Sequence, residues 1–166
     1  MGTITVTFKL NGDDVTVIAD TRDTLLNVLK EKLNIVSVKR GCDEGQCGAC
    51  TVLLDGKPVA SCLIPMGKVN NKTIMTLEGL QNDPIMKSLQ EEFVKEFATQ
   101  CGICTPGFLI TSYVVIKEYM LKNNINNIDL IKKEVAKMLV GNICRCGTYK
   151  ESEKAIINTI IKLRLK

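Results

Sequence analysis

The chain has 166 residues, 45% of them hydrophobic, which allows one ordinary domain or two small ones with packed aliphatic cores. Its net charge of +4 comes from scattered lysines without a basic stripe or aromatic platforms, so we expect no nucleic-acid partner. The complete absence of histidine excludes His-based acid–base catalysis, Cys/His nucleophilic dyads and Rieske-type iron ligation.

The N-terminal residues alternate between apolar and polar side chains, which predicts a half-buried strand over 3–10. Asn11-Gly12 is a strong hairpin signal, and the alternation continues on a return strand through Ala19. Asp23 is expected to cap a helix with a leucine stripe, which consists of Leu25, Leu26, Leu29 and Leu33. The chain start lacks the apolar core of a signal peptide, and no apolar run approaches the roughly 20 residues of a membrane span. We therefore expect a cytoplasmic protein without a membrane span.

A loop crowded with cysteine and glycine follows, with the sequence GCDEGQCGAC at 41–50. Its three cysteines and the next one along the chain form the first candidate ligand set: Cys42, Cys47, Cys50 and Cys62. The first three match the spacing of plant-type ferredoxins, in which four thiolates hold a [2Fe–2S] cluster. Glycines suit such a loop, because it needs positive φ angles and must aim several backbone N–H groups at sulfur. A zinc site with four cysteine ligands is the alternative, and this spacing favours it less.

Two further strand signals surround Cys62. A second hairpin is predicted over 51–61 with its turn at Asp55-Gly56, and a short strand is predicted over 73–76. Together with the first hairpin and the helix, they describe a small mixed sheet with a helix across one face, the β-grasp arrangement of plant-type ferredoxins. We place this ferredoxin-like domain at 1–78, with the cysteine loop near the surface at one end.

The period of the apolar residues changes from two to 3.6 near residue 79, which predicts an all-α domain over 79–166. Asp83-Pro84 and Thr105-Pro106 each combine a capping residue with a proline at the first helical position, and predict two helices, one continuing to residue 98 and one towards 123. After a polar loop at 123–127, a helix from Asp129 should stop at Gly141, and a capping box at 148–151 should open a last helix. Four helices with short connections predict a four-helix bundle, so the expected fold class is α+β.

This second domain contains the other four cysteines: Cys101, Cys104, Cys144 and Cys146. They form a Cys-Gly-Ile-Cys pair and a Cys-Arg-Cys pair, and each pair stands just before a predicted helix N-terminus. The partial positive charge of a helix N-terminus offsets the charge of a thiolate-ligated cluster and helps to keep the thiolates ionised. The pattern predicts a second [2Fe–2S] cluster. A structural zinc site with four cysteines stays open from spacing alone, although zinc more often uses two Cys-x-x-Cys pairs.

With both cysteine sets in view, the chain resembles the two-cluster [2Fe–2S] subunit of the molybdenum hydroxylases. That superfamily includes xanthine dehydrogenase, aldehyde oxidoreductases, isoquinoline oxidoreductase and aerobic-type carbon monoxide dehydrogenase. The resemblance covers nearly the whole chain. It is carried by KRGCDEGQCGACTV at 39–52, the serine-cysteine at 61–62, TLEGL at 76–80, QCGICTPG at 100–107 and GNICRCGTY at 141–149.

The resemblance implies an electron-transfer subunit that passes electrons singly from a molybdopterin centre to FAD or an external acceptor, without itself binding or turning over the substrate. The second cysteine set would hold an inner cluster beside the molybdenum-molybdopterin cofactor of a large subunit. The first set would hold an outer cluster, towards an FAD-binding medium subunit or another acceptor. The resemblance also implies that Gln100 hydrogen-bonds the pterin and that Cys146 is the ligand closest to it. Spacing alone favours a solvated helix end for Gln100.

The chain departs from the family pattern at two places. It reads Cys146-Gly147-Thr148-Tyr149 where many members have Thr-Gly after the cysteine, and this form resembles the isoquinoline oxidoreductase branch. Lys150 stands where an arginine is more usual. Two alternative functions stay open: a free-standing ferredoxin-type electron carrier, which leaves the helical domain and Gln100 without a role, and a zinc-stabilised interaction module.

Overall fold

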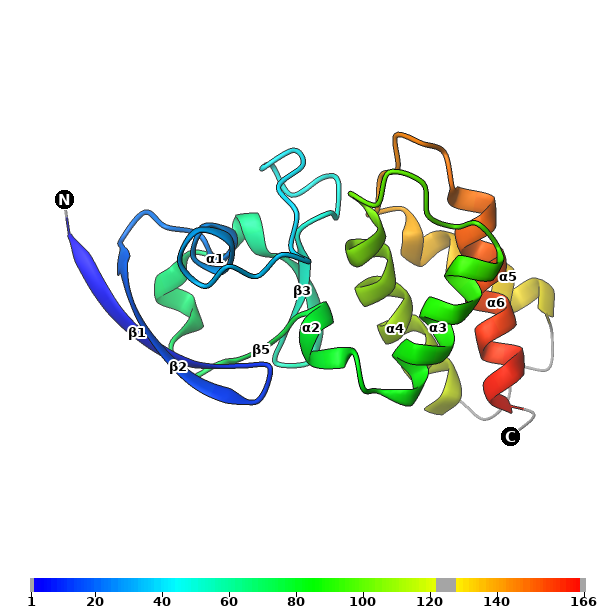
Figure 1. The fold of residues 1–166 in the computed structure, drawn as a ribbon, viewed down its shortest axis with the longest axis horizontal. Helices are drawn as coiled ribbons and strands as arrows, with labels where there is room; N and C mark the ends of the chain where they lie inside the picture. The colour runs from blue at the N-terminus through cyan, green and yellow to red at the C-terminus, as the bar shows by residue number, and fades with distance from the viewer. Residues whose placement is uncertain (1, 122–127, 165–166) are drawn as a thin grey trace.

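The computed structural model describes residues 2–121 and 128–164. Its N-terminal part is a mixed five-stranded sheet and its C-terminal part is helical, so the predicted α+β class is confirmed (Figure 1). The strands are β1 (Thr3–Leu10), β2 (Asp13–Asp20), β3 (Thr51–Leu54), β4 (Lys57–Ala60) and β5 (Thr73–Met75), in the order β2-β1-β5-β3-β4. β5 lies parallel to β1 and antiparallel to β3.

Both predicted hairpins are present, and their turns explain the residues found there. Asn11 and Gly12 have φ angles of 55° and 103°, and Asp55 and Gly56 have φ angles of 49° and 80°. Two consecutive positive φ angles are typical of the type I′ turn, whose twist matches that of the flanking strands. The two turns therefore fix the register of β1 with β2 and of β3 with β4.

The first helix differs from the prediction in its cap and its geometry. Thr24, and not Asp23, caps α1 (Leu25–Asn27): the Thr24 hydroxyl accepts from the backbone N–H of Asn27 at 3.3 Å. The Asp23 carboxylate instead accepts from the Asp20 N–H and forms an ion pair with Lys32. The helix continues as a π-helical turn over Val28–Lys32. Because this turn widens the helical period, Leu33 leaves the leucine stripe and is only partly buried.

The chain leaves the sheet through two 3₁₀ turns (Ser61–Leu63 and Met66–Val69) and then becomes helical: α2 (Leu77–Leu80), α3 (Pro84–Lys95), α4 (Thr105–Leu121), α5 (Ile128–Leu139) and α6 (Tyr149–Arg164). The Asp83 cap is confirmed, since its carboxylate accepts from the N–H groups of Ile85 and Met86. No helix in the described part of the chain is both long and apolar enough to cross a membrane.

The predicted helix ends need five corrections. Helix α3 stops at Lys95 instead of residue 98, because Phe97 adopts a φ of +56°. Helix α4 starts one residue early, at Thr105, and Asp129 lies within the first turn of α5 and does not cap it. Gly141 has no left-handed φ, so it is not the predicted C′ glycine. The Thr148 hydroxyl faces the Cys144 sulfur and does not form the predicted capping box. The polar loop predicted at 123–127 lies outside the described residues.

Each of the two parts has its own cluster of buried side chains. The first lies between the sheet and α1 and includes Phe8, Leu25 and Val52, whereas the second lies among α3–α6 and includes Phe108 and Ile156. Leu53 of β3 belongs to the helical cluster, so the sheet and the helices pack against each other. In Figure 1 the sheet lies to one side and the helices to the other, and the cysteine-bearing loops gather along the upper edge where the two parts meet.

Candidate metal centres

The first cysteine loop turns its backbone N–H groups towards sulfur, as predicted. The Cys42 Sγ atom accepts from the N–H groups of Glu44 at 3.4 Å, and of Gln46 and Cys47 at 3.3 Å. The Cys47 Sγ atom accepts in return from the Cys42 N–H at 3.3 Å. These N–H dipoles stabilise the thiolate and lower the pKa of Cys42 to about 7. The loop therefore prepares Cys42 to bind a metal as a thiolate.

This loop needs its glycines for two different reasons. Gly45 and Gly48 have φ angles of 76° and 69°, which confirms the predicted left-handed backbone. Gly41 has no such φ, but a Cβ atom there would lie 2.6 Å from the Cys47 Sγ atom. Arg40 fixes the base of the loop through ion pairs of 2.8 Å with Glu31 and Asp43. The loop is thus held open around its sulfurs by backbone shape and by one guanidinium group.

Cys50 and Cys62 complete the first set from the buried side. Cys50 ends the loop, and Cys62 lies in the 3₁₀ turn that follows β4. Burial and the neighbouring Cys50 thiol raise the pKa of Cys62 to about 11. The first set therefore consists of two adjacent pairs, Cys42 with Cys47 and Cys50 with Cys62.

The second set is paired in the same way. Among the neighbouring thiols, Cys144 affects the pKa of Cys104 most and Cys146 affects the pKa of Cys101 most, so these cysteines are neighbours in two pairs. Burial raises the pKa of Cys104 to about 12, with the neighbouring Cys144 adding to the shift. Cys104 directly precedes α4, and Cys144 and Cys146 stand shortly before α6, so both helix N-termini lie at this set as predicted. Each pair joins one cysteine from the α4 side to one from the α6 side.

Thr148 and Tyr149 support Cys144, which motif spacing did not predict. The Thr148 Oγ1 atom lies 3.2 Å from the Cys144 Sγ atom, and the Tyr149 hydroxyl accepts from the Cys144 N–H at 2.8 Å. Burial would raise the pKa of Cys144, but the Thr148 hydroxyl and N–H outweigh burial and lower it to about 7. A threonine at a helix start next to a cysteine pair was the signal in the sequence, which we interpreted as a capping box.

Paired sulfurs fit a two-iron cluster. Each iron of a [2Fe–2S] cluster takes two protein ligands, so four cysteines arranged as two pairs match its needs. A mononuclear zinc site requires four sulfurs around one ion. All eight cysteines are free thiols. Each four-cysteine set therefore suits a two-iron cluster, and the ligand roles of the individual cysteines remain predictions.

The segments that contain the two cysteine sets lie against each other, which the sequence did not predict. The backbone N–H of Ile143 donates to the carbonyl oxygen of Cys47 at 2.9 Å. A Cβ atom on Gly107, in the first turn of α4, would lie 2.1 Å from the carbonyl oxygen of Gly48. A Cβ atom on Gly48 would meet the Gly141 carbonyl oxygen at 2.4 Å and the Asn142 Nδ2 atom at 2.6 Å. The first loop thus packs directly on both segments that contain the second set.

Gln100 lies next to Cys101 and is exposed, as Cys101 itself is. Cys146 is partly buried. The exposed Gln100 side chain therefore has room to contact another molecule. Their predicted contact with a pterin remains a prediction.

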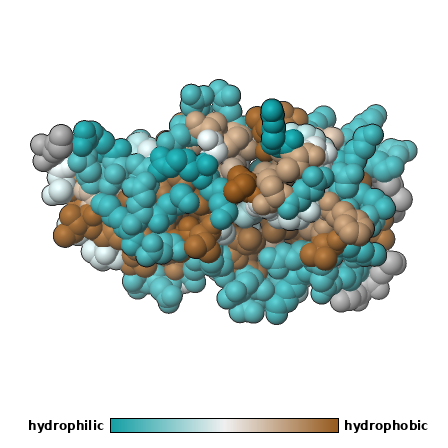
Figure 2. Space-filling view, turned by 45° about the horizontal axis from the view of Figure 1, so that its top comes forward, coloured by the Kyte–Doolittle hydropathy of each residue, from teal (hydrophilic) through white to brown (hydrophobic). Residues whose placement is uncertain are grey.

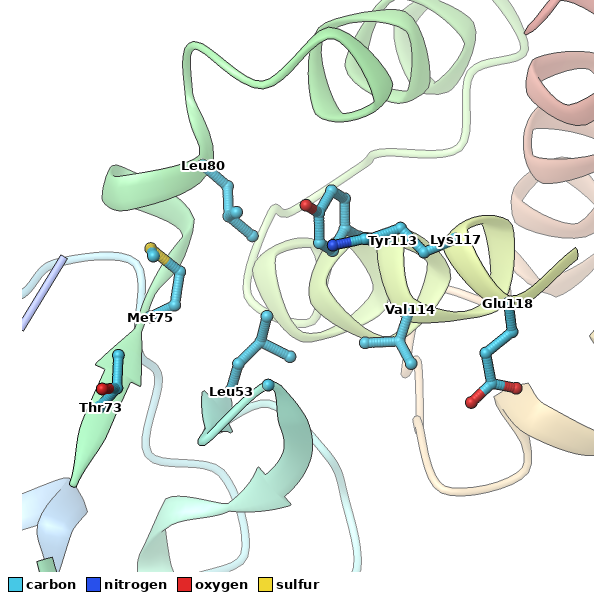
Figure 3. A pocket seen from close by; sticks show the side chains of 9 residues that line it. Leu53, Thr73, Met75, Leu80, Tyr113, Val114, Lys117 and Glu118 are labelled. Carbon is cyan, nitrogen blue, oxygen red and sulfur yellow. The ribbon is translucent and has the colours of Figure 1, made fainter. Parts of the chain in front are cut away.

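A cavity of about 370 Å³ lies between the sheet and α4, away from both cysteine sets. Figure 3 shows Leu53 and Met75 from the strands, Leu80 from α2 and Tyr113 and Val114 from α4 around it. Its lining contains no cysteine. The cavity is therefore a feature of the junction between the two parts and not of the candidate metal centres.

Two family profiles match the chain, and together they cover most of it. One, described as a 2Fe-2S iron-sulfur cluster binding domain, matches residues 4–94, and the other, described as a [2Fe-2S] binding domain, matches residues 76–157. The first range contains the four cysteines of the first set, and the second range contains the four of the second set. The profiles thus assign an iron–sulfur binding region to each cysteine set.

Curated relatives match along nearly the whole chain. The nicotinate dehydrogenase small FeS subunit of Eubacterium barkeri is 36% identical over 156 residues, which are 94% of both chains. The aldehyde oxidoreductase iron-sulfur-binding subunit PaoA of Escherichia coli K12 is 38% identical over 152 residues, 87% of this chain and 66% of that protein.

Solved structures have the same fold. Quinoline 2-oxidoreductase from Pseudomonas putida 86 contains a chain that superposes with a TM-score of 0.84 and 32% identity, over 98% of this chain and 97% of that one. The aldehyde oxidoreductase from Desulfovibrio desulfuricans ATCC 27774 superposes with a TM-score of 0.82 and 36% identity. The match covers 96% of this chain but 17% of that polypeptide.

Proposed function

The chain belongs to the family of iron–sulfur small subunits of the molybdenum hydroxylases and holds two [2Fe–2S] clusters, and from this premise we propose that it is the electron-transfer subunit of such an enzyme. It would receive electrons from the molybdopterin centre of a large subunit and pass them singly to FAD or an external acceptor. Cys101, Cys104, Cys144 and Cys146 would hold the inner cluster. Cys42, Cys47, Cys50 and Cys62 would hold the outer one.

The observation that supports this proposal best is the direct contact between the two segments that contain the ligand sets. The hydrogen bond from the Ile143 N–H to the Cys47 carbonyl joins a predicted ligand of the outer cluster to the residue before Cys144, a predicted ligand of the inner one. Electron transfer between two cofactors needs a short route of bonds and hydrogen bonds. The clusters supply the one-electron chemistry, and this chain's residues hold, insulate and orient them.

We propose that the inner cluster faces the large subunit. Apolar side chains around the second set are exposed, and they include Phe97, Ile103, Val140 and Ile143. Figure 2, in which the upper edge of Figure 1 is turned forward, shows brown apolar areas among the teal ones on this face. We take these side chains as part of the surface that the large subunit would cover. Gln100 and Cys146 lie at this end, where they would meet the pterin.

The remaining finer assignments complete the proposal. Residues 1–78 would form a β-grasp, plant-type ferredoxin-like domain, and residues 79–166 a four-helix domain. An FAD-binding medium subunit would lie nearer the outer cluster, and the substrate would be bound by the large subunit alone. Named relatives act on nicotinate, aldehydes and quinoline, which supports an N-heteroaromatic or aldehyde substrate for the assembled enzyme. Eight free thiols support a reducing compartment such as the cytoplasm.

A free-standing ferredoxin-type carrier is the second candidate function. It accounts for the first cysteine set and for the backbone N–H groups that donate to its sulfurs. It gives the exposed apolar residues and Gln100 no partner. The two candidates differ in their oligomeric state, since only the subunit has a permanent large partner.

The test is purification of the tagged chain from its native host. We expect a complex that contains a molybdenum-binding large subunit, two distinct [2Fe–2S] EPR signals and two irons per four-cysteine set. A chain that purifies as an iron-loaded monomer would support the carrier and overturn the subunit proposal. A colourless chain with one zinc per cysteine set would overturn both.

A further inference from the structure

Asn142 lies between the two cysteine sets, and in the described part of the chain its side-chain amide has no assigned role. It follows α5 and is 3% exposed, and its Nδ2 atom is buried without a hydrogen-bond partner in the described structure. This atom lies against Gly48, where an added Cβ atom would approach it to 2.6 Å. Gly48 stands between Cys47 and Cys50, so the amide group faces the first ligand loop.

Among the described residues no acceptor is placed to hydrogen-bond the Asn142 Nδ2 atom, and two carbonyl oxygens of the facing loop already accept from other donors. The Gly48 carbonyl oxygen accepts from the Thr51 N–H at 3.1 Å and from the Thr51 hydroxyl at 2.7 Å, and the Cys47 carbonyl oxygen accepts from the Ile143 N–H. A buried N–H donor without an acceptor is rare and destabilising, and it calls for a missing partner such as a bound group. The bound group expected at this place is an iron–sulfur cluster, whose sulfur atoms accept hydrogen bonds.

We propose that the Asn142 side-chain amide donates a hydrogen bond to a sulfur of the cluster held by Cys42, Cys47, Cys50 and Cys62, and thereby raises the reduction potential of this cluster. This inference rests on the proposed function, because it requires a cluster at the first set. Reduction adds one negative charge to the cluster, so a hydrogen bond to its sulfur is stronger in the reduced state. Asn142 belongs to the segment that contains the second set, so it would also couple the outer cluster to the correct packing of the helical part.

Asn142→Leu tests the proposal, because leucine has a similar volume and no donor. In an EPR-monitored redox titration of the assembled enzyme, we expect the ratio of reduced to oxidised outer cluster at a fixed potential to fall roughly fivefold, as for the loss of one hydrogen bond. This corresponds to a shift of about 40 mV to lower potential, since a tenfold change is 59 mV for one electron. The inner cluster should keep its potential.

Two further variants separate the loss of the hydrogen bond from a general disturbance of folding. Asn142→Asp keeps the shape and replaces the N–H donor by an acceptor, so it should lower the outer potential at least as much as the leucine variant. Ser112→Ala is the matched control, because Ser112 is also buried with an unpartnered side chain but lies in the middle of α4. It should change neither potential.

The outcomes separate the two proposals. If the leucine and aspartate variants load two clusters and the outer potential is unchanged, the hydrogen bond does not exist and Asn142 only packs against Gly48. If the aspartate variant shifts both clusters equally and the leucine variant shifts neither, the effect is one of charge and the inference is also overturned. If the unaltered protein contains no iron at its first cysteine set, the proposed function itself has failed.

Discussion

The backbone N–H of Ile143 donates to the carbonyl oxygen of Cys47 at 2.9 Å, and this hydrogen bond joins two segments that are 96 residues apart in the chain. It connects the loop of the first cysteine set to the residue directly before Cys144. Close approach at this junction depends on missing side chains, since a Cβ atom on either Gly48 or Gly107 would overlap the facing segment. The relative position of the two sets is therefore fixed by backbone contacts.

Gly107→Ala should disturb this junction. The added methyl group would meet the Gly48 carbonyl oxygen, and we expect a loss of about 1–3 kcal/mol in the free energy of unfolding, as for an overpacked core. Magnetic coupling between the two reduced clusters, measured by low-temperature EPR, should also weaken. Gly141→Ala is the matched control: a Cβ atom there has nothing within 4 Å, so the expected change is within about 0.5 kcal/mol. Equal stability of the two variants would contradict the close packing of Gly107 on Gly48.

Tyr149→Phe should weaken the second site and spare the first. The Tyr149 hydroxyl accepts from the Cys144 N–H at 2.8 Å, and its removal leaves that donor unpaired, at a cost of about 1–3 kcal/mol in stability. We expect a changed EPR signal from the second cluster and an unchanged signal from the first. Tyr113→Phe is the control, because the Tyr113 hydroxyl donates to Asp83 away from both sets, so this variant should keep both signals. An altered first signal in Tyr149→Phe would contradict the assignment.

The sequence predicted the local features of this protein better than the relationships between its parts. The turns at Asn11-Gly12 and Asp55-Gly56 and the Asp83 cap were predictable, because each depends on a few neighbouring residues. The Thr24 cap was missed because two adjacent residues both have capping side chains, and the Lys32 amine engages one of them. The Thr148 hydroxyl was assigned to a capping box, but the Cys144 sulfur competes for it.

The contact of Cys47 with Ile143 and the approach of Gly107 to Gly48 depend on how the sheet packs on the helices. No local pattern contains that information. The cysteine spacing predicted two sets of four, whereas the pairing of Cys101 with Cys146 and of Cys104 with Cys144 became visible only with α4 and α6 in place.

The ionised Glu78 carboxylate should stabilise the fold, and this stabilisation should be lost in acid. Its carboxylate accepts from the Ser37 N–H at 2.9 Å and from the hydroxyls of Ser37 and Thr76 at 2.6 Å. Burial alone would raise the pKa of Glu78, but these hydrogen bonds outweigh it and hold the pKa below the usual 4.5. A lowered pKa in the folded state stabilises the protein above pH 4.5, and this contribution is lost as the pH falls through the folded-state value.

Glu78→Gln is therefore expected to flatten the dependence of stability on pH in urea denaturation at pH 7 and at roughly pH 3.5. Ser37→Ala removes one of the donors and should give an intermediate slope. If Glu78→Gln loses as much stability between the two pH values as the unaltered protein, other carboxylates determine the acid sensitivity.

Phe97→Gly should raise the stability of the chain and weaken its assembly with the large subunit. Phe97 has a φ of +56° and its side chain is 80% exposed. Glycine adopts such a φ without strain, so we expect the chain to gain about 1 kcal/mol in the free energy of unfolding. If Phe97 contacts the large subunit, the same variant should bind that subunit more weakly. Ile18→Ser, which removes an apolar side chain that is 67% exposed on β2, is the control and should leave assembly unchanged. Weaker binding in both variants, or in neither, would contradict an interface at Phe97.

Cys104→Ser should abolish one cluster and leave the other. The two predicted ligand sets share no cysteine, and the side chains under each belong to different buried clusters. We therefore expect one EPR signal and half of the iron to be lost, with the signal of the first set retained and turnover of the assembled enzyme stopped. Cys50→Ser should give the reciprocal result, with the signal of the second set retained. Loss of both signals in Cys104→Ser would show that the contact between Cys47 and Ile143 makes the two sites assemble as one unit.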